Sequence, residues 1–187
     1  MIKRMSDIGI SLIIISILIL PCIFIWIAVK LTSKGPGLYW SRRIGYKSKF
    51  FMMPKFRTMI LDTPEIESNQ LLDPKKYVTP FGFFLRKTSL DEIPQFFSVL
   101  IGDMSVVGPR PALHNQYKLI AKRKQFRIDI LRPGITGWAQ INGRDKLLPS
   151  RKIYLDLQYL NQRSILFDFK IILKTILLVI TLKNINH

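Results

Sequence analysis

Several residue types are scarce in this chain of 187 residues, and each scarcity excludes a class of chemistry. The single cysteine, Cys22, rules out a disulfide framework and a zinc site built from clustered cysteines. Two histidines, His114 and His187, argue against a multi-histidine metal site and against most Ser-His catalysis. Only 12 residues are acidic. Any acid, base or hard-metal chemistry must therefore come from a few carboxylates.

Basic residues are abundant by contrast: Lys and Arg total 29, and the formal net charge is +17. Such a charge suits a nucleic-acid-binding protein, but 48% of the residues are hydrophobic and the mean hydropathy is +0.19, which is too apolar for most soluble basic proteins. The combination indicates a membrane surface, or a phosphate-rich substrate handled beside one. The length suits one domain with a substantial core.

The first apolar stretch, residues 8–29, contains no charged residue. A helix of this length, at ~1.5 Å per residue, reaches across a ~30 Å hydrocarbon core, and no small-residue cleavage site follows it. We expect it to stay in the mature protein. Pro21 lies inside it and predicts a kink, while the basic residues on both flanks favour two cytoplasmic ends. The residue pattern leaves open a kinked spanning helix and a re-entrant helix broken at Pro21.

Residues 30–61 are basic and rich in aromatic side chains, which is typical of a juxtamembrane segment that contacts anionic lipid headgroups. The segments on either side of Gly45 and Tyr46 predict a short β-hairpin. Near the other end, residues 171–182 are apolar but too short to span a bilayer. We expect them to lie as a helix in the membrane interface.

The middle of the chain contains three further segments with clear patterns. Apolar spacing predicts amphipathic helices over residues 89–100 and 111–130. Residues 132–144 contain three glycines and a proline and predict a shaped loop. This loop is either the wall of a phosphate or nucleotide pocket, or a tight connection with Trp138 in the core. No Walker A or dinucleotide-binding glycine pattern is present.

Asp91 and Glu92 are adjacent carboxylates in a chain with few acids, and Arg86 precedes them. One interpretation is structural, because Ser89 and Glu92 have the spacing of a helix capping box. The other is chemical: an ionised carboxylate at a helix start can attack phosphorus while its neighbour holds Mg²⁺. Arg110 lies between Pro109 and Pro111, which suits phosphate recognition and equally suits an ion pair with a carboxylate.

Distinctive motifs follow one another along nearly the whole chain. They are Lys3-Arg4, the apolar segment with Pro21, Ser33-Lys34-Gly35-Pro36, Arg43-Ile44-Gly45, Lys55-Phe56-Arg57-Thr58-Met59, Thr88-Ser89-Leu90-Asp91-Glu92-Ile93-Pro94-Gln95, GDMSVVGPRP at 102–111, RPGITGWAQINGR at 132–144, Tyr154-Leu155-Asp156 and Asp168-Phe169-Lys170. With these motifs the chain resembles the bacterial sugar transferase family, the monotopic phosphoglycosyl transferases.

The resemblance implies an α-rich α+β fold in a monotopic membrane protein. It implies a re-entrant helix broken at Pro21 within residues 1–32, and a catalytic domain at the cytoplasmic face over residues 33–187, with a short β-hairpin and interfacial amphipathic helices. Leu20 departs from the pattern, since many relatives have Ser before this proline. The location implied is the bacterial inner (cytoplasmic) membrane.

The same resemblance implies transfer of a sugar 1-phosphate from a UDP-sugar to undecaprenyl phosphate with release of UMP, the first membrane step of surface polysaccharide or glycoconjugate assembly. Asp91 is the implied nucleophile, forming a phosphosugar-aspartyl intermediate, and Asp91 and Glu92 together hold Mg²⁺. The expected substrate contacts are Lys55, Arg86, Arg110, Pro111, Gln140, Arg144, Asp156 and Asp168.

The partners implied are the UDP-sugar, undecaprenyl phosphate, membrane phospholipids and downstream glycosyltransferases, with no nucleic acid. A homodimer is compatible with a membrane enzyme of this size. A different class of function stays open on the residues alone: a catalytically silent basic membrane scaffold or binding protein. In that case Asp91 and Glu92 serve only to cap a helix.

Overall fold

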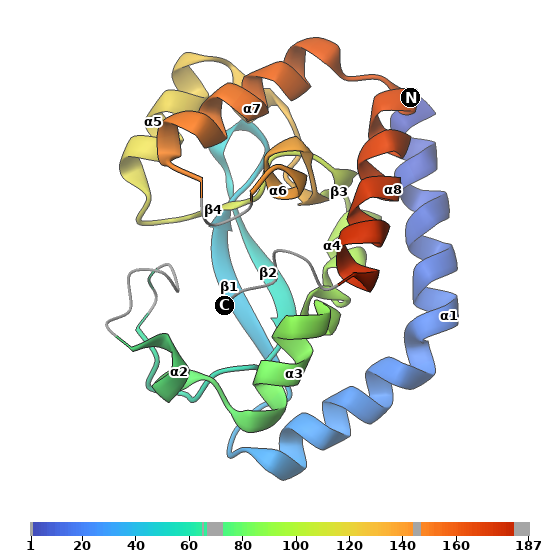
Figure 1. The fold of residues 1–187 in the computed structure, drawn as a ribbon, viewed down its shortest axis with the longest axis vertical. Helices are drawn as coiled ribbons and strands as arrows, with labels where there is room; N and C mark the ends of the chain where they lie inside the picture. Colours follow the sequence, from blue (N-terminus) through green and yellow to red (C-terminus); the bar gives the residue numbers. More distant parts are fainter. Residues whose placement is uncertain (1, 65, 67–72, 144–146, 182–187) are drawn as a thin grey trace.

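The computed structural model describes residues 2–64, 66, 73–143 and 147–181. This part of the chain is helix-rich with a few short strands, as expected (Figure 1). The helices are α1 (Ile2–Thr32), α2 (Pro74–Tyr77), α3 (Pro80–Thr88), α4 (Gln95–Ile101), α5 (Tyr117–Gln125), α6 (Trp138–Ile141), α7 (Pro149–Gln162) and α8 (Ile165–Ile180), with 3-10 helices η1 (Tyr46–Ser48), η3 (Leu90–Glu92) and η4 (Ile128–Ile130). The strands are β1 (Leu38–Ile44), β2 (Phe50–Phe56), β3 (Ser105–Val107), β4 (Ala112–Leu113) and β5 (Gly134–Thr136).

Two small sheets organise the centre of the molecule. β1 pairs antiparallel with β2 across η1, with Leu38 opposite Phe56 and Ile44 opposite Phe50, and β4 adds to the other edge of β1. β3 and β5 form a separate parallel pair. The aromatic segments on either side of Gly45 and Tyr46 therefore form two paired strands.

α1 is a continuous helix with Pro21 in its interior, and its ribbon bends partway along its length (Figure 1). Within the described residues it is the one helix long and apolar enough to cross a membrane. Many of its large apolar side chains are exposed, including Ile17 at 68% and Phe24 at 71%. Such a surface is typical of a helix that contacts a membrane or another protein.

The N-terminal end of α1 is tied to the rest of the protein by buried and partly buried polar contacts. Lys3 Nζ lies 2.6 Å from Asp168 Oδ2 on α8. Buried Asp7 accepts hydrogen bonds from Ser105 Oγ at 2.8 Å and from the backbone N–H of Val106 at 3.0 Å. Because β3 is central to the fold, these contacts fix the start of α1 against the folded body.

The C-terminal end of α1 is attached to the same body. Arg57, which follows β2, donates through Nη2 to both the carbonyl and the hydroxyl of Ser33 at 2.7 Å. A guanidinium at this position also complements the negative end of the helix dipole. Ile25 and Val29 pack against Phe56 and Leu85 in a buried cluster. Both ends of the apolar helix are therefore held by one compact body.

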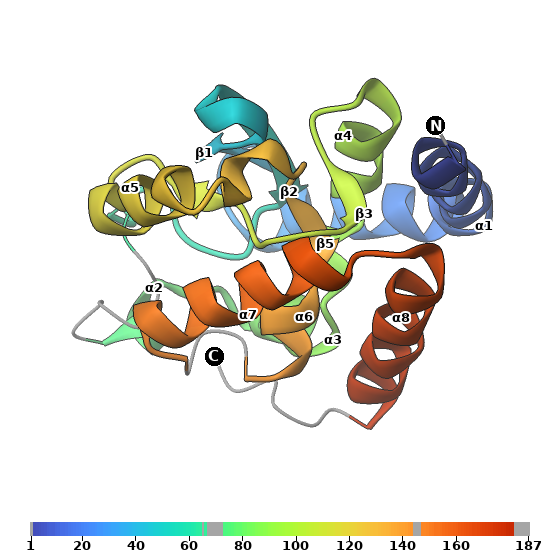
Figure 2. The ribbon, with the colours of Figure 1, turned by 90° about the horizontal axis from the view of Figure 1, so that it is seen from above.

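The main core forms where the two sheets meet the helices. It contains Val99 and Met104 together with Val106, Ile128 and Tyr159. α8 lies on the same side of the molecule as α1, on the far side from α5 and α2 (Figures 1 and 2). Exposed apolar residues on α8, such as Leu166 and Ile180, therefore lie on the side of the molecule that α1 occupies.

Three sequence predictions need correction. Residues 89–100 do not form one helix, because η3 ends at Glu92 and Pro94 precedes the separate helix α4. Residues 111–130 hold β4, α5 and η4 rather than one long helix. Residues 132–144 are not only a loop: they contain β5 and α6. In the last case a two-stranded parallel pairing, which no local pattern reveals, converts glycine-rich chain into a strand.

Reversing the charge of Lys3 should loosen the start of α1. Lys3→Glu places two carboxylates together, and we expect it to lower the free energy of unfolding by about 1–2 kcal/mol, a modest figure because Lys3 is 39% exposed. Arg4, which donates to the carbonyl of Leu100 at 2.8 Å, keeps the helix attached. Thermal unfolding in detergent measures the effect. The conservative variant Lys3→Arg, which keeps a cation beside Asp168, should retain most of the stability, and a loss as large as that of Lys3→Glu would contradict the pairing.

Candidate functional site

Asp91 and Glu92 lie on η3, a single turn between α3 and α4. Ser89, with a left-handed φ of 58°, ends α3 and begins η3. Its side chain makes no capping hydrogen bond to η3, so the structural alternative, a helix capping box, is not formed although the sequence spacing matches it. The Glu92 side chain faces elsewhere: its Oε1 accepts from Arg110 Nη2 at 2.9 Å. The interpretation of Asp91 and Glu92 as part of a helix cap therefore lacks the side-chain hydrogen bond that defines a capping box.

Three cations from separate elements act on buried Asp91. They are Lys55 on β2, Arg86 in the last turn of α3, and Arg110 before β4. Burial and the adjacent negative charge of Glu92 raise the pKa of Asp91 to about 6, while the three cations oppose that rise. Burial, and next the charge of Arg43, lower the pKa of Lys55 to about 8. A carboxylate and an amine perturbed in opposite directions at one place are typical of a functional site.

A close backbone contact positions Arg110. The Gly108 N–H donates to the Thr136 carbonyl, and the Gly134 N–H donates to the Pro109 carbonyl, both at 2.9 Å. A Cβ on Gly108 would lie 2.3 Å from the Arg132 carbonyl, and one on Gly134 would lie 2.1 Å from the Gly108 nitrogen. Only glycine allows this approach. The turn that carries Arg110 is therefore locked onto β5.

Arg110 also lines a pocket that is rich in cations. Among the residues that the structure describes, its lining contains Arg43, Arg110, Arg123 and Lys152 and no carboxylate. Pro111, Ala112, Gln116, Leu119, Ala139 and Gln140 complete it. A pocket of this charge favours an anion. It adjoins the carboxylate pair through Arg110, whose guanidinium contacts Glu92. We refer to it below as the cation pocket.

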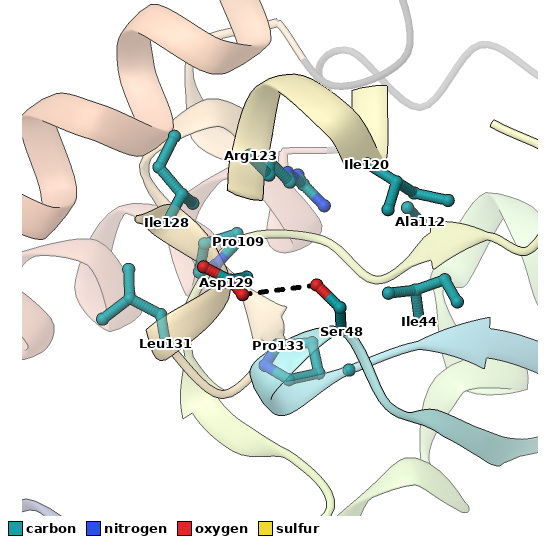
Figure 3. A pocket seen from close by; sticks show the side chains of 11 residues that line it. Ile44, Ser48, Pro109, Ala112, Ile120, Arg123, Ile128, Asp129, Leu131 and Pro133 are labelled. Atoms are coloured by element: carbon teal, nitrogen blue, oxygen red, sulfur yellow. Dashed lines mark hydrogen bonds between the residues drawn. The ribbon is translucent and has the colours of Figure 1, made fainter. Parts of the chain in front are cut away.

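A smaller pocket is also lined by Arg123 (Figure 3). Its lining is mostly apolar, with Ile44, Ile128 and Leu131 among the contributors, and Ser48 Oγ donates to Asp129 Oδ2 at 3.3 Å across it. Arg123 thus borders both pockets. Asp156, a predicted site residue, holds Arg123 through Oδ2, which lies 2.7 Å from Nη2. Burial raises the pKa of Asp156, and Arg123 counteracts that rise.

The structure brings together most of the predicted site residues and separates one. Lys55, Arg86 and Arg110 surround the carboxylate pair, and Pro111 and Gln140 line the cation pocket beside it. Asp168 lies elsewhere: its Oδ2 pairs with Lys3, and its Oδ1 accepts from Tyr159 Oη at 2.6 Å. Arg144 lies outside the described residues.

Trp138 belongs to the edge of the core, where its ring lies 5.0 Å from that of Phe167. Of the two alternatives for residues 132–144, this residue supports the tight connection, while Gln140 faces the cation pocket. The segment therefore packs against the core and also lines the cation pocket.

Three cations of the cation pocket, Arg43, Arg123 and Lys152, were absent from the predicted site residues. Arg123 lies within the run Lys122-Arg123-Lys124, whose pattern is that of a solvated helix face. Lys152 is one turn before Asp156 on α7, and Arg43 lies in a segment interpreted as juxtamembrane. For Arg43, the motif Arg43-Ile44-Gly45 was an available signal. For Arg123 and Lys152 no local signal exists, because only tertiary packing brings them to the pocket.

Asp91 and Glu92 fit a Mg²⁺ ion by the chemistry of their donors. They supply two adjacent carboxylates, and Mg²⁺ commonly binds one or two carboxylates together with substrate phosphates. Their mutual repulsion contributes to the raised pKa of Asp91, and a divalent cation would relieve it. Within the described residues no group of three or more His, Cys, Asp and Glu side chains gathers at one place. The protein would therefore leave several coordination positions to substrate and water.

Comparisons with known proteins bear on the whole chain. Residues 1–182 match a family model described as bacterial sugar transferase. The chain is 40% identical over 186 residues to the UDP-glucose:undecaprenyl-phosphate glucose-1-phosphate transferase of Escherichia coli (strain K12), covering 94% of this chain and 39% of that protein. It is 33% identical over 190 residues to the undecaprenyl-phosphate galactose phosphotransferase of Salmonella typhimurium, covering 92% and 39%.

A third relative is similar in length to this chain. It is an uncharacterized sugar transferase of Bacillus subtilis, EpsL, 36% identical over 185 residues, with 99% of this chain and 90% of that protein covered. The chain thus spans about two fifths of the length of the first two relatives and most of the third.

Proposed function

The chain belongs to the bacterial sugar transferase family, and we propose that it transfers a sugar 1-phosphate from a UDP-sugar to undecaprenyl phosphate and releases UMP. The observation that carries the proposal is the carboxylate pair of buried Asp91 and partly buried Glu92, with Lys55, Arg86 and Arg110 around it and the cation pocket beside it. A nucleoside diphosphate sugar presents two linked phosphates, and this arrangement provides a nucleophile next to cations that can hold them.

The reaction takes two displacements at one phosphorus atom. A carboxylate oxygen of Asp91 attacks the sugar-bearing phosphorus, the bond from that phosphorus to the bridging oxygen breaks, and UMP leaves with the electron pair. An oxygen of undecaprenyl phosphate then attacks the same phosphorus, the bond to Asp91 breaks, and the carboxylate is regenerated. Arg110 and Lys55 are placed to offset charge on the phosphates during both steps.

Mg²⁺ is the proposed cofactor, held by Asp91 and Glu92. When bound, it supplies positive charge against the phosphate oxygens. The chain's own residues orient this pair: Arg110 holds Glu92 through Oε1, and the position of η3 between α3 and α4 fixes both carboxylates.

We further propose that α1 is re-entrant and that the catalytic body lies at the cytoplasmic face of the inner membrane. The support is that both ends of α1 contact one folded body, through Lys3 and Asp7 at the start and Ser33 at the end. A helix that crossed the bilayer would place its two ends on opposite sides, ~30 Å apart along the membrane normal. The exposed apolar middle of α1 would dip into the bilayer, and its bend allows both ends to return to one face.

The topology is tested by cysteine labelling in bacterial membranes. In a Cys22→Ser background, Met5→Cys and Lys34→Cys place single thiols at exposed positions near the two ends of α1. We expect a membrane-impermeant maleimide to label both in inverted vesicles and neither in intact spheroplasts. Labelling of either position in spheroplasts would contradict the re-entrant arrangement. Detergent-solubilised protein, in which both thiols react, is the control.

The reaction is tested by UMP release from a panel of UDP-sugars, with Mg²⁺ and detergent-solubilised undecaprenyl phosphate. The panel includes glucose and galactose donors, the sugars printed in the names of relatives. We expect UMP with one or two donors, dependent on the lipid phosphate and lost on addition of EDTA. Silence across the panel from folded, membrane-inserted protein would favour the scaffold alternative.

A further inference from the structure

Arg123 lies in the middle of a chain of contacts that ends at the carboxylate pair. Its Nε and Nη2 donate to Asp156 Oδ2 at 3.1 and 2.7 Å, and its Nη1 donates to the backbone carbonyl of Arg110 at 2.8 Å. Arg110 Nη2 in turn donates to Glu92 Oε1 at 2.9 Å. The Arg123 guanidinium therefore joins α5, α7 and the turn before β4, and the Arg110 guanidinium links that turn to η3.

The ion pair of Arg123 and Asp156 is buried, and its hydrogen-bond geometry is specific to arginine. The side chains of Arg123 and Asp156 are 12% and 2% exposed. Buried ion pairs leave an uncompensated charge when one partner is removed. Arginine can donate to a carboxylate and to a carbonyl in different directions at once because its guanidinium is a planar fork, whereas lysine presents a compact point charge. All three hydrogen bonds of the Arg123 guanidinium go to protein acceptors, namely Asp156 and the Arg110 carbonyl. Arg123 also lines the cation pocket.

We propose that Arg123, held by Asp156, is a positioning residue that sets the direction of the Arg110 side chain, and this inference rests on the proposed function. Pro109 and Pro111 restrict the backbone on both sides of Arg110, so a fixed carbonyl fixes the base of the side chain. The Arg110 guanidinium is then held in one orientation toward Glu92 and toward the phosphates of the substrate. A misplacement of about 1 Å at such a group can cost on the order of 100-fold in rate.

Two substitutions of Arg123 separate positioning from structural support. Arg123→Gln removes both the charge and the fork. Arg123→Lys keeps a cation beside Asp156 but loses the hydrogen bond to the Arg110 carbonyl. We expect Arg123→Lys to unfold near the wild-type temperature while kcat falls about 10- to 100-fold and KM for the UDP-sugar stays within about threefold. Lys122→Gln, at an exposed neighbouring position on α5, is the matched control with wild-type values.

A double-mutant cycle identifies the path of the effect. Arg110→Lys retains a cation at the site, and if Arg123 acts through Arg110, adding Arg123→Lys should cost less than threefold more. Additive losses, or a wild-type kcat in Arg123→Lys, would overturn the proposal. If Arg123→Gln fails to fold, the lysine variant still decides. An inactive wild-type protein would instead reject the proposed function, so the two failures are distinguishable.

Discussion

Asp91→Asn is expected to abolish sugar-phosphate transfer, lowering kcat on the order of 10⁴-fold or more, because the amide cannot form the covalent intermediate. Asp91 has the position that a nucleophile needs: it is buried, and Lys55, Arg86 and Arg110 act on its charge. The measurement is UMP release with the donor identified from the panel. The control is Asp62→Asn, which removes an exposed carboxylate that is not among the groups acting on Asp91 and lines neither pocket, and it should keep wild-type activity.

The covalent step has its own signature. Wild-type protein incubated with the donor in the absence of undecaprenyl phosphate should gain the mass of one sugar phosphate, and Asp91→Asn should not. Loss of turnover in the variant without an adduct in the wild type would indicate direct transfer between the two substrates. Appreciable turnover in Asp91→Asn would reject the nucleophile assignment.

Local sequence identified candidate site residues and the membrane segment where the signal lies within a few neighbouring residues. The adjacent Asp91 and Glu92, the arginine between two prolines, and the uncharged stretch at residues 8–29 were all recognisable without a structure. Each signal is a short-range one: acid next to acid, proline next to arginine, or a continuous apolar run. These features singled out Asp91, Glu92 and Arg110, which lie together at η3 and the turn before β4. The helix-rich class and the placement of Lys55 and Arg86 at the site were implied by the family resemblance.

Local sequence was misleading or silent where tertiary contacts decide. Ser89 and Glu92 match a capping box, yet Ser89 adopts a left-handed conformation and Glu92 pairs with Arg110. Arg123 resembles its solvated neighbours until α7 brings Asp156 beside it. The attachment of both ends of α1 depends on partners far along the chain, such as Asp168 for Lys3. No periodicity encodes contacts of this kind, since they join residues that the fold alone brings together.

The same Asp91→Asn substitution should stabilise the fold at neutral pH. The folded-state pKa of Asp91 is raised to about 6 from an ordinary value of 3.8, chiefly by burial and then by Glu92. A raised carboxyl pKa means that the protonated form is favoured on folding. Its stabilising contribution is complete below pH ~4 and is lost as pH rises through ~6. Asparagine resembles the protonated carboxyl and does not ionise, so the variant escapes that loss.

We therefore expect the variant and the wild type to unfold at similar temperatures near pH 4, and the variant to gain on the order of 2–3 kcal/mol by pH 7.5 in the presence of EDTA. For a chain of this size the gain corresponds to roughly 5–10 °C in Tm. Asp62→Asn should show no such trend. If the difference in free energy of unfolding between variant and wild type is constant across the pH range, or if the variant is less stable at pH 7.5, the raised pKa assigned to Asp91 from burial and repulsion by Glu92 is contradicted.

Magnesium should narrow this stability difference if Asp91 and Glu92 hold it. A cation that binds the ionised pair stabilises the wild-type fold by mass action and offsets the burial of charge on Asp91. The variant retains one carboxylate and should respond less. Thermal unfolding at pH 7.5 with Mg²⁺ in place of EDTA measures the effect without any turnover, and an equal response of both proteins would place the metal elsewhere. The stability that wild-type Asp91 lacks at neutral pH is the cost of keeping an ionisable carboxylate, the proposed nucleophile, in a buried site.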